Sequence, residues 1–177
     1  ISEILNVRSQ IDQNVLADAI ETLANAGRVE FYAFGGSAPV AMDGQHKFFR
    51  LKIPSSYISD PHIQFMSANS LGKDDVVVAI SQSGTTSALI DSVKIVRKSG
   101  VKVIGIMPGN TPLASICDYP LVINIGDNNR ISKPHTSRIA YTVVIDVLTM
   151  GVAQLKPEAQ DHLYNIADSQ RSLRVKE

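Results

Sequence analysis

Two short stretches rich in small and hydroxyl-bearing residues stand out in the sequence: "GGSAP" (35–39) and "SQSGTT" (81–86). Each follows an apolar run and precedes a segment with helical spacing, so each predicts a turn from a strand into a helix. Such a turn offers free backbone N–H groups and the positive end of a helix dipole, which together can bind an anion without a nearby cation. Gly36 and Gly84 would relax the φ restriction and let a phosphate approach the backbone, while the hydroxyls add donors.

Either loop alone also suits an ordinary turn. Thr85 or Thr86 would serve as a helix N-cap, and a Gly-Gly pair is a common turn sequence. The two loops form one binding site only if the fold brings them together.

The spacing of apolar residues predicts helices alternating with strands. Predicted helices cover 14–28, about 39–50, 61–71, 87–100, 137–155 and 157–173, with a short one at 113–116, and predicted strands cover 29–34, 55–59, 75–80, 101–107 and 119–125.

This alternation predicts an α/β fold, a three-layer α-β-α sandwich around a five-stranded parallel sheet. Strands 29–34, 75–80 and 101–107 are almost wholly apolar, as central strands should be, whereas 55–59 is polar and Pro120 suits an edge strand. The simplest compatible order is the flavodoxin-like 2-1-3-4-5. In that order the connections diverge between the first and third strands, so the two loops meet at one crevice.

Size and charge limit the class of protein. A chain of 177 residues suits one domain, and 17 basic against 17 acidic residues give no net charge, a poor footprint for nucleic acid. A single cysteine, Cys117, excludes an internal disulfide framework and fits a reducing cytosol. No signal-peptide pattern precedes the domain, and no apolar run approaches the roughly 18–20 residues of a membrane span. The start at Ile1 is expected of a piece of a longer protein.

Other chemical signatures are absent from the sequence. It has no G-x-x-x-x-G-K-[ST], no G-x-G-x-x-G after the first strand and no G-x-S-x-G. The histidines at 46, 62, 135 and 162 and the lone cysteine do not have the spacing of metal ligands. We therefore expect neither a metal nor a cofactor.

The loop "SQSGTT" after "DVVVAI" resembles the S-x-S-G-x-T signature of the sugar isomerase (SIS) domain, and "GGSA" resembles its first phosphate loop. The segments "FGGSAPVAMDGQHKFFRL" and "TSRIAYTVVIDVLTMGVAQL" are similar to the effector domains of RpiR-type transcriptional regulators, in particular the HexR group that controls hexose catabolism. The resemblance covers nearly the whole chain. It implies one phosphosugar-binding domain over residues 1–177 and a preceding helix-turn-helix domain outside this chain that contacts DNA.

Carried over by position, the resemblance implies phosphate ligands in both loops. They are Ser37, Ser81, Ser83 and Thr86, with Gly36 and Gln82 nearby.

Candidate partners for the sugar end of the ligand follow the second and fifth strands. His62 follows the second strand, and Lys133, His135 and Arg138 follow the fifth, at the same sheet edge. A solvated histidine at a helix start, or a helix cap with solvated charges, explains these residues as well. Asp43, His46 and Lys47 have the spacing of a charged helix face.

An aldose–ketose isomerase needs a carboxylate base. The five glutamates are residues 3, 21, 30, 158 and 177, so none lies between 31 and 157, although Asp43 or Asp127 could substitute. We therefore predict a binding module rather than an enzyme. A stand-alone phosphosugar isomerase is the alternative, and a dimerisation domain whose loops bind nothing is a third interpretation.

The resemblance implies 2-keto-3-deoxy-6-phosphogluconate as effector, with its carboxylate near Lys133 or Arg138. The apolar helices 137–155 and 157–173 predict a homodimer or higher oligomer, and ligand binding would change the spacing of its DNA-binding domains. We expect a cytoplasmic protein with no membrane partner.

Overall fold

The computed structural model describes residues 7–126 and 133–171. Its sheet contains five parallel strands in the order β2-β1-β3-β4-β5, which confirms the predicted topology. The strands are β1 (Arg28–Ala33), β2 (Ser55–Ile58), β3 (Asp75–Ile80), β4 (Lys102–Met107) and β5 (Tyr119–Val122). Pro120 lies on β5, at an edge of the sheet as expected.

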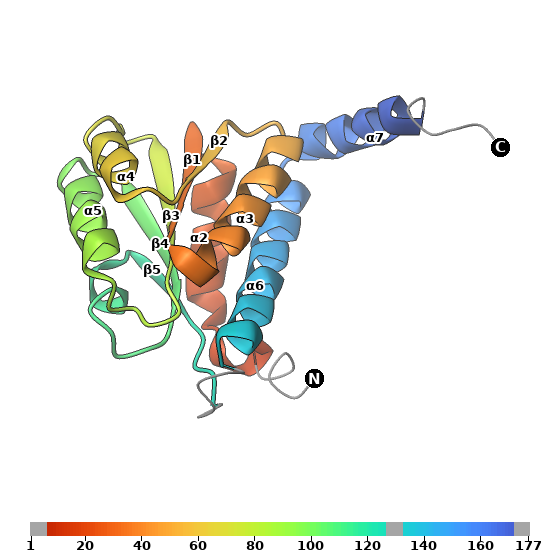
Figure 1. The fold of residues 1–177 in the computed structure, drawn as a ribbon. Coiled ribbons are helices and arrows are strands. Elements are labelled where there is room, and N and C mark those ends of the chain that lie inside the picture. The colour runs from red at the N-terminus through yellow and green to blue at the C-terminus, as the bar shows by residue number, and fades with distance from the viewer. Residues whose placement is uncertain (1–6, 127–132, 172–177) are drawn as a thin grey trace.

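Helices cover both faces of the sheet and complete the predicted three layers (Figure 1). One face carries α2 (Gln13–Ala24), α3 (Ala38–Arg50) and α6 (Lys133–Leu155), and the other carries α4 (Pro61–Ala68) and α5 (Ser87–Lys98). Short 3₁₀ turns occupy Gly35–Ser37 and Ala114–Ile116. A last helix, α7 (Pro157–Arg171), follows α6.

Side chains of the central strands alternate between two hydrophobic cores. On β3, Val76, Val78 and Ile80 pack beneath α2, α3 and α6, while Val77 and Ala79 belong to the core beneath α4 and α5. This period of two places every β3 side chain from Val76 onward out of solvent, which explains the continuous apolar run in the sequence.

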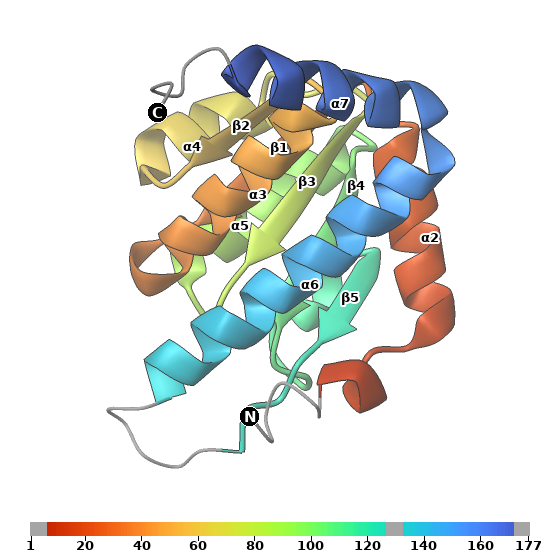
Figure 2. The same ribbon diagram turned by 90° about the vertical axis from the view of Figure 1, so that its right-hand side faces the viewer.

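Helix α6 is more extensive than expected. By length and composition alone, His135–Leu155 is apolar enough to cross a membrane, contrary to the expectation that no run approaches that size. A buried core helix passes the same test, so this is weak evidence for a span. One side of α6 packs against α2 and α3 (Figure 2), with Val144, Ile145 and Leu148 fully buried.

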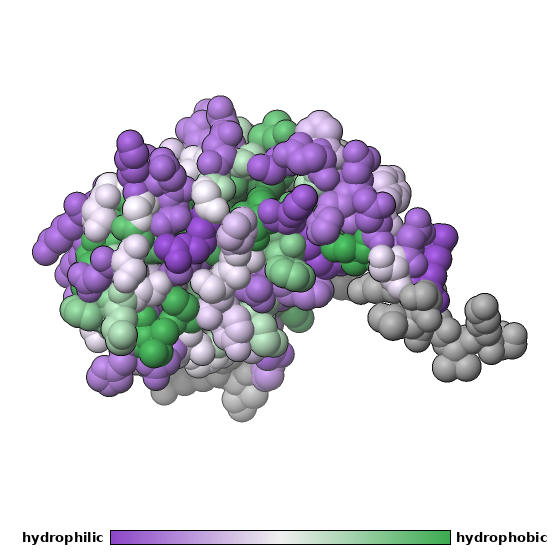
Figure 3. All heavy atoms as spheres, turned by 90° about the horizontal axis from the view of Figure 1, so that it is seen from above, coloured by the Kyte–Doolittle hydropathy of each residue, from purple (hydrophilic) through white to green (hydrophobic). Residues whose placement is uncertain are grey.

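Helix α7 extends beyond the rest of the molecule (Figure 1), and hydrophilic side chains cover much of it when it is seen from above (Figure 3). Ala159 is buried and Leu163 packs against the core, but Tyr164 is 73% exposed. The described contacts with the core therefore come from the first half of the helix.

Several predicted boundaries were wrong for local reasons. Helix α6 begins at Lys133 instead of 137, with Pro134 in its first turn, where a missing N–H has no effect. Helix α4 ends at Ala68 instead of 71, because the side chains of Asn69 and Ser70 bond to the carbonyls of the preceding turn. Strand β5 ends at Val122 instead of 125.

Candidate functional site

Strands β1 and β3 pair along their whole length and end level with each other, with Ala33 opposite Ile80. The chain then leaves β1 toward α3 on one face of the sheet and β3 toward α5 on the other. A cavity of about 150 Å³ lies between the two loops. All six predicted phosphate-binding residues line it: Gly36, Ser37, Ser81, Gln82, Ser83 and Thr86. The other lining residues are Phe34, Ile80 and Leu89. We call it the phosphate cavity; its ligand stays a prediction.

The two helices that start at this cavity are not capped by their own side chains. Ser37 is the N-cap residue of α3 and Thr86 that of α5, and neither side chain makes a capping hydrogen bond. Neither helix has an acidic residue in its first turn. By contrast, Asp12 and Asp60 accept N–H bonds at the starts of α2 and α4. The donors and positive dipole ends at the cavity therefore remain available to an anion.

The loop after β3 is shaped by its own hydroxyls. The Gly84 N–H donates to the Ser81 hydroxyl at 3.0 Å, and Thr85 donates to the Ser83 hydroxyl from its N–H at 3.2 Å and from its own hydroxyl at 3.0 Å. Gly84 has a φ of +63°, which favours glycine. In the other loop the glycine with positive φ is Gly35, not Gly36 as expected.

Thr111, which was not predicted from the sequence, packs against this loop. A Cβ at position 84 would clash with the Thr111 side chain, so the backbone approaches Thr111 more closely than any residue other than glycine at position 84 would allow. The Leu113 N–H also donates to the Gly84 carbonyl at 3.1 Å. The sequence "PGNTP" (108–112) is typical of a loop, but its contact with Gly84 depends on the neighbouring positions of β3 and β4.

A second cavity, of about 110 Å³, adjoins the first through the shared residue Gln82. Its other lining residues are Pro108, Asn124, Ile125, Ser137 and Tyr141. The loops after β3, β4 and β5 thus meet the start of α6 here, at the carboxyl edge of the sheet. The sequence did not indicate this cavity.

The residues predicted for the sugar end do not line either cavity within the described part of the chain. His62 is exposed in the first turn of α4, and Arg138 is exposed in α6, next to Ser137 of the second cavity. The side chain of Lys133 and all of Asp127 lie outside the described residues.

The carboxylates of Glu30 and Asp43 have structural partners. Glu30 is buried on β1, where it accepts hydrogen bonds from Tyr32 at 3.0 Å and from Ser67 of α4 at 2.5 Å. Asp43 pairs with Lys47 at 2.6 Å, and Lys47 also contacts Asp146 of α6 at 2.5 Å. The charged face of α3 is therefore a contact with α6.

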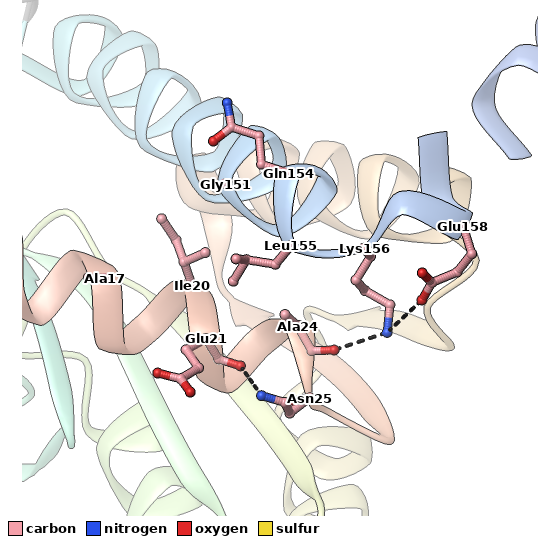
Figure 4. Close-up of a pocket in the computed structure, with 10 residues that line it drawn as sticks. All are labelled: Ala17, Ile20, Glu21, Ala24, Asn25, Gly151, Gln154, Leu155, Lys156 and Glu158. Atoms are coloured by element: carbon pink, nitrogen blue, oxygen red, sulfur yellow. Dashed lines mark hydrogen bonds and ion pairs between the residues drawn. The ribbon is translucent and has the colours of Figure 1, made fainter. Parts of the chain in front are cut away.

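Another hollow, of about 670 Å³, lies between the end of α2 and the junction of α6 and α7 (Figure 4). Ile20 and Leu155 line it, and Lys156 binds the Ala24 carbonyl at 3.0 Å and Glu158 at 3.7 Å. Since α2 ends just before β1 begins, this hollow is at the amino edge of the sheet, away from the loops 35–39 and 81–86. Its one lysine, Lys156, is already paired with Glu158 and the Ala24 carbonyl, so the hollow is a weaker candidate for an anion site.

The comparisons with known proteins agree with the observed fold. The SIS domain family model matches residues 22–151, and the chain belongs to this family. The bifunctional protein glk of Burkholderia thailandensis is 39% identical over 86% of this chain, which corresponds to 24% of that protein. The HTH-type transcriptional regulator HexR of Pseudomonas aeruginosa is 34% identical over 96% of this chain and 60% of its own length. The chain thus spans only part of these relatives.

Solved structures share the architecture. The Vibrio vulnificus NanR protein complexed with ManNAc-6P superposes with a TM-score of 0.91 at 22% identity, over 99% of this chain and 67% of NanR. The sugar isomerase domain of an RpiR transcription factor from Sphaerobacter thermophilus gives 0.81 at 19% identity, over 94% and 93%. A sugar-phosphate isomerase candidate from Listeria monocytogenes gives 0.70 at 19%, over 87% and 85%. These likenesses establish the fold, and the SIS domain of this chain is similar in sequence to the corresponding part of HexR.

Replacing Gly84 with alanine tests the packing of the loop. We expect Gly84→Ala to lower the free energy of unfolding by more than the roughly 1 kcal/mol of a strained φ, because the new Cβ also meets Thr111. Gly100→Ala is the matched control, since Gly100 has a φ of +77° and open space around it. Urea unfolding of both variants measures the difference, and equal losses would contradict the close contact.

Proposed function

We propose that this domain senses a phosphorylated sugar and relays its presence to a DNA-binding segment of a longer regulator. The observation that carries the proposal is the pair of uncapped helix N-termini, α3 and α5, facing one cavity lined by hydroxyls. A phosphate would receive backbone N–H and hydroxyl hydrogen bonds there and would lie at the positive ends of two helix dipoles.

The regulatory role is supported by the similarity to HexR, named as a helix-turn-helix regulator, and by the likeness to NanR, whose complex contains a phosphosugar. The chain itself carries no net charge, so we assign DNA contact to a separate segment of the whole protein. A regulator of this kind would act in the cytoplasm.

A phosphosugar isomerase is the alternative function, supported by likenesses such as the Listeria structure. Isomerisation requires a base beside the sugar carbon. The described residues that line the two cavities include neither a carboxylate nor a histidine, and Glu30 is committed to Tyr32 and Ser67. We therefore favour binding without turnover.

For the effector we propose 2-keto-3-deoxy-6-phosphogluconate, which the resemblance of the sequence to HexR-type regulators implies. Its phosphate would occupy the phosphate cavity through Ser37, Ser81, Ser83 and Thr86. Lys133, Arg138 or His62 would supply a cation for its carboxylate, because a buried carboxylate without donors or a cation is costly.

Removing a hydroxyl from the phosphate cavity should weaken binding. A hydrogen bond to a charged group contributes roughly 1.5–3 kcal/mol, so Ser81→Ala or Ser83→Ala should weaken phosphosugar affinity about ten- to a hundredfold. Ser99→Ala, an exposed position at the far end of α5, is the control and should bind as the unmodified protein does. Isothermal titration calorimetry measures both, and unchanged affinity in the two cavity variants would refute the assignment.

Effector choice can be tested by thermal shift. At equal concentration, 2-keto-3-deoxy-6-phosphogluconate should raise the melting temperature more than glucose 6-phosphate or fructose 6-phosphate, because tighter binding to the native state stabilises it more. The largest shift with an N-acetylated amino-sugar phosphate would support the phosphate site but contradict this effector.

An activity assay tests the alternative function. Turnover of an aldose phosphate at about 1 per second or faster would establish an isomerase.

We also propose that the domain forms a homodimer through the outer face of α3, α6 and α7. A 15-residue helix with most of its side chains in water is marginal on its own, and the described contacts of α7 with the core come from its first half, at Ala159 and Leu163. Phe49 of α3 and Met150 of α6 are 63% and 60% exposed on the same side of the sheet. A second copy of the chain would bury these side chains and support α7.

A charge on this face should disrupt the dimer. We expect Phe49→Asp to reduce the mass measured by light scattering from that of a dimer toward that of a monomer. Phe65→Asp is the matched control, because Phe65 is 52% exposed on α4, on the opposite face of the sheet, and should leave the dimer intact. A monomeric unmodified domain, or loss of the dimer only with Phe65→Asp, would refute this interface.

A further inference from the structure

One buried polar group lacks a hydrogen-bond partner at the second cavity. Tyr141 of α6 lines this cavity and is 1% exposed, and its hydroxyl oxygen is buried without a hydrogen bond to any described residue. Buried hydroxyls in proteins are almost always hydrogen-bonded, because an unsatisfied one keeps its desolvation cost without compensation. Burial also raises the pKa of Tyr141 well above its ordinary value, so the hydroxyl remains a donor at neutral pH.

The contrast with Tyr32 shows that this is not the general state of tyrosines in the molecule. Tyr32 is equally buried, but its hydroxyl donates to Glu30 at 3.0 Å. The unpartnered hydroxyl is the one beside a cavity that adjoins the phosphate cavity through Gln82.

The other polar groups of the second cavity suit an oxygen-rich ligand. The Asn124 side-chain oxygen accepts the Gly109 N–H at 3.0 Å, which fixes the amide and leaves its NH₂ group as the donor. Gln82 adds a second amide, and the described lining carries no charged side chain. Each cavity is smaller than the roughly 300–1,000 Å³ that holds a drug-sized molecule, so a phosphate in one and a short polar chain in the other fit their sizes.

We propose that the second cavity binds the non-phosphate end of the sugar phosphate, and that the Tyr141 hydroxyl donates a hydrogen bond to a carbonyl, hydroxyl or carboxylate oxygen of that end. This assignment rests on the proposed function, which places the phosphate in the neighbouring cavity. It makes Tyr141 a residue that distinguishes a phosphosugar from free phosphate.

Tyr141→Phe tests the assignment because it removes only the hydroxyl. We expect the affinity for 2-keto-3-deoxy-6-phosphogluconate or glucose 6-phosphate, whichever binds the unmodified domain more tightly, to fall about five- to thirtyfold, as for one lost hydrogen bond to a polar or charged oxygen. The affinity for inorganic phosphate should stay unchanged. The melting temperature of the ligand-free variant should equal or exceed that of the unmodified protein, because an unsatisfied buried group is removed.

Tyr32→Phe is the matched control. It should lower the ligand-free melting temperature, since Glu30 loses a donor, and leave both affinities unchanged. The proposal is overturned if Tyr141→Phe binds the phosphosugar as the unmodified domain does, or weakens phosphosugar and inorganic phosphate equally. If the unmodified domain binds neither probe, the proposed function itself fails and this assignment fails with it.

Discussion

The parallel pairing of β1 with β3 is the constraint on which the candidate site depends. Because the two strands end level with each other and their helices start on opposite faces, two helix N-termini meet across the sheet edge. The backbone of the fold therefore creates the anion-binding geometry before any particular side chain is chosen. The sequence supplies small residues, which leave space for an anion near the backbone. It also supplies N-cap residues, Ser37 and Thr86, whose hydroxyls do not bond to their own helices.

Helix dipoles alone would not balance a phosphate. Each N-terminus acts as roughly half a positive charge, whereas a phosphate monoester carries about 1.5 to 2 negative charges at neutral pH. The remaining stabilisation falls to directed N–H and hydroxyl donors. A site of this kind selects by geometry rather than by net charge, which fits a chain whose acidic and basic residues are equal in number.

Periodicity, turn chemistry and resemblance to a family predicted the fold class and the strand order. They also predicted the six residues that line the phosphate cavity. The second cavity could not be predicted, since it assembles from three loops and the start of a helix whose contacts depend on tertiary packing. In the sequence Tyr141 is one more aromatic residue of an apolar helix. Only the structure shows that its hydroxyl lacks a hydrogen-bond partner among the described residues. Thr111 was missed for a related reason, because its role depends on how close Gly84 lies. The buried residues Val7 and Ile11 were not assigned to any element, as their short segment has too little periodicity.

The contact of Thr111 with Gly84 has a consequence for how occupancy would be sensed. Hydrogen bonds from Gly84 and Thr85 within the loop, and from Leu113 to Gly84, fix the shape of the 81–86 loop through contacts of the protein itself. A loop that is already ordered loses little conformational entropy when a ligand binds. A small molecule with few contacts can therefore bind well. A loop with the same shape empty and filled cannot, however, carry a signal, since a ligand shifts an equilibrium only through contacts that differ between two states. The moving part of such a sensor would have to lie beyond this loop.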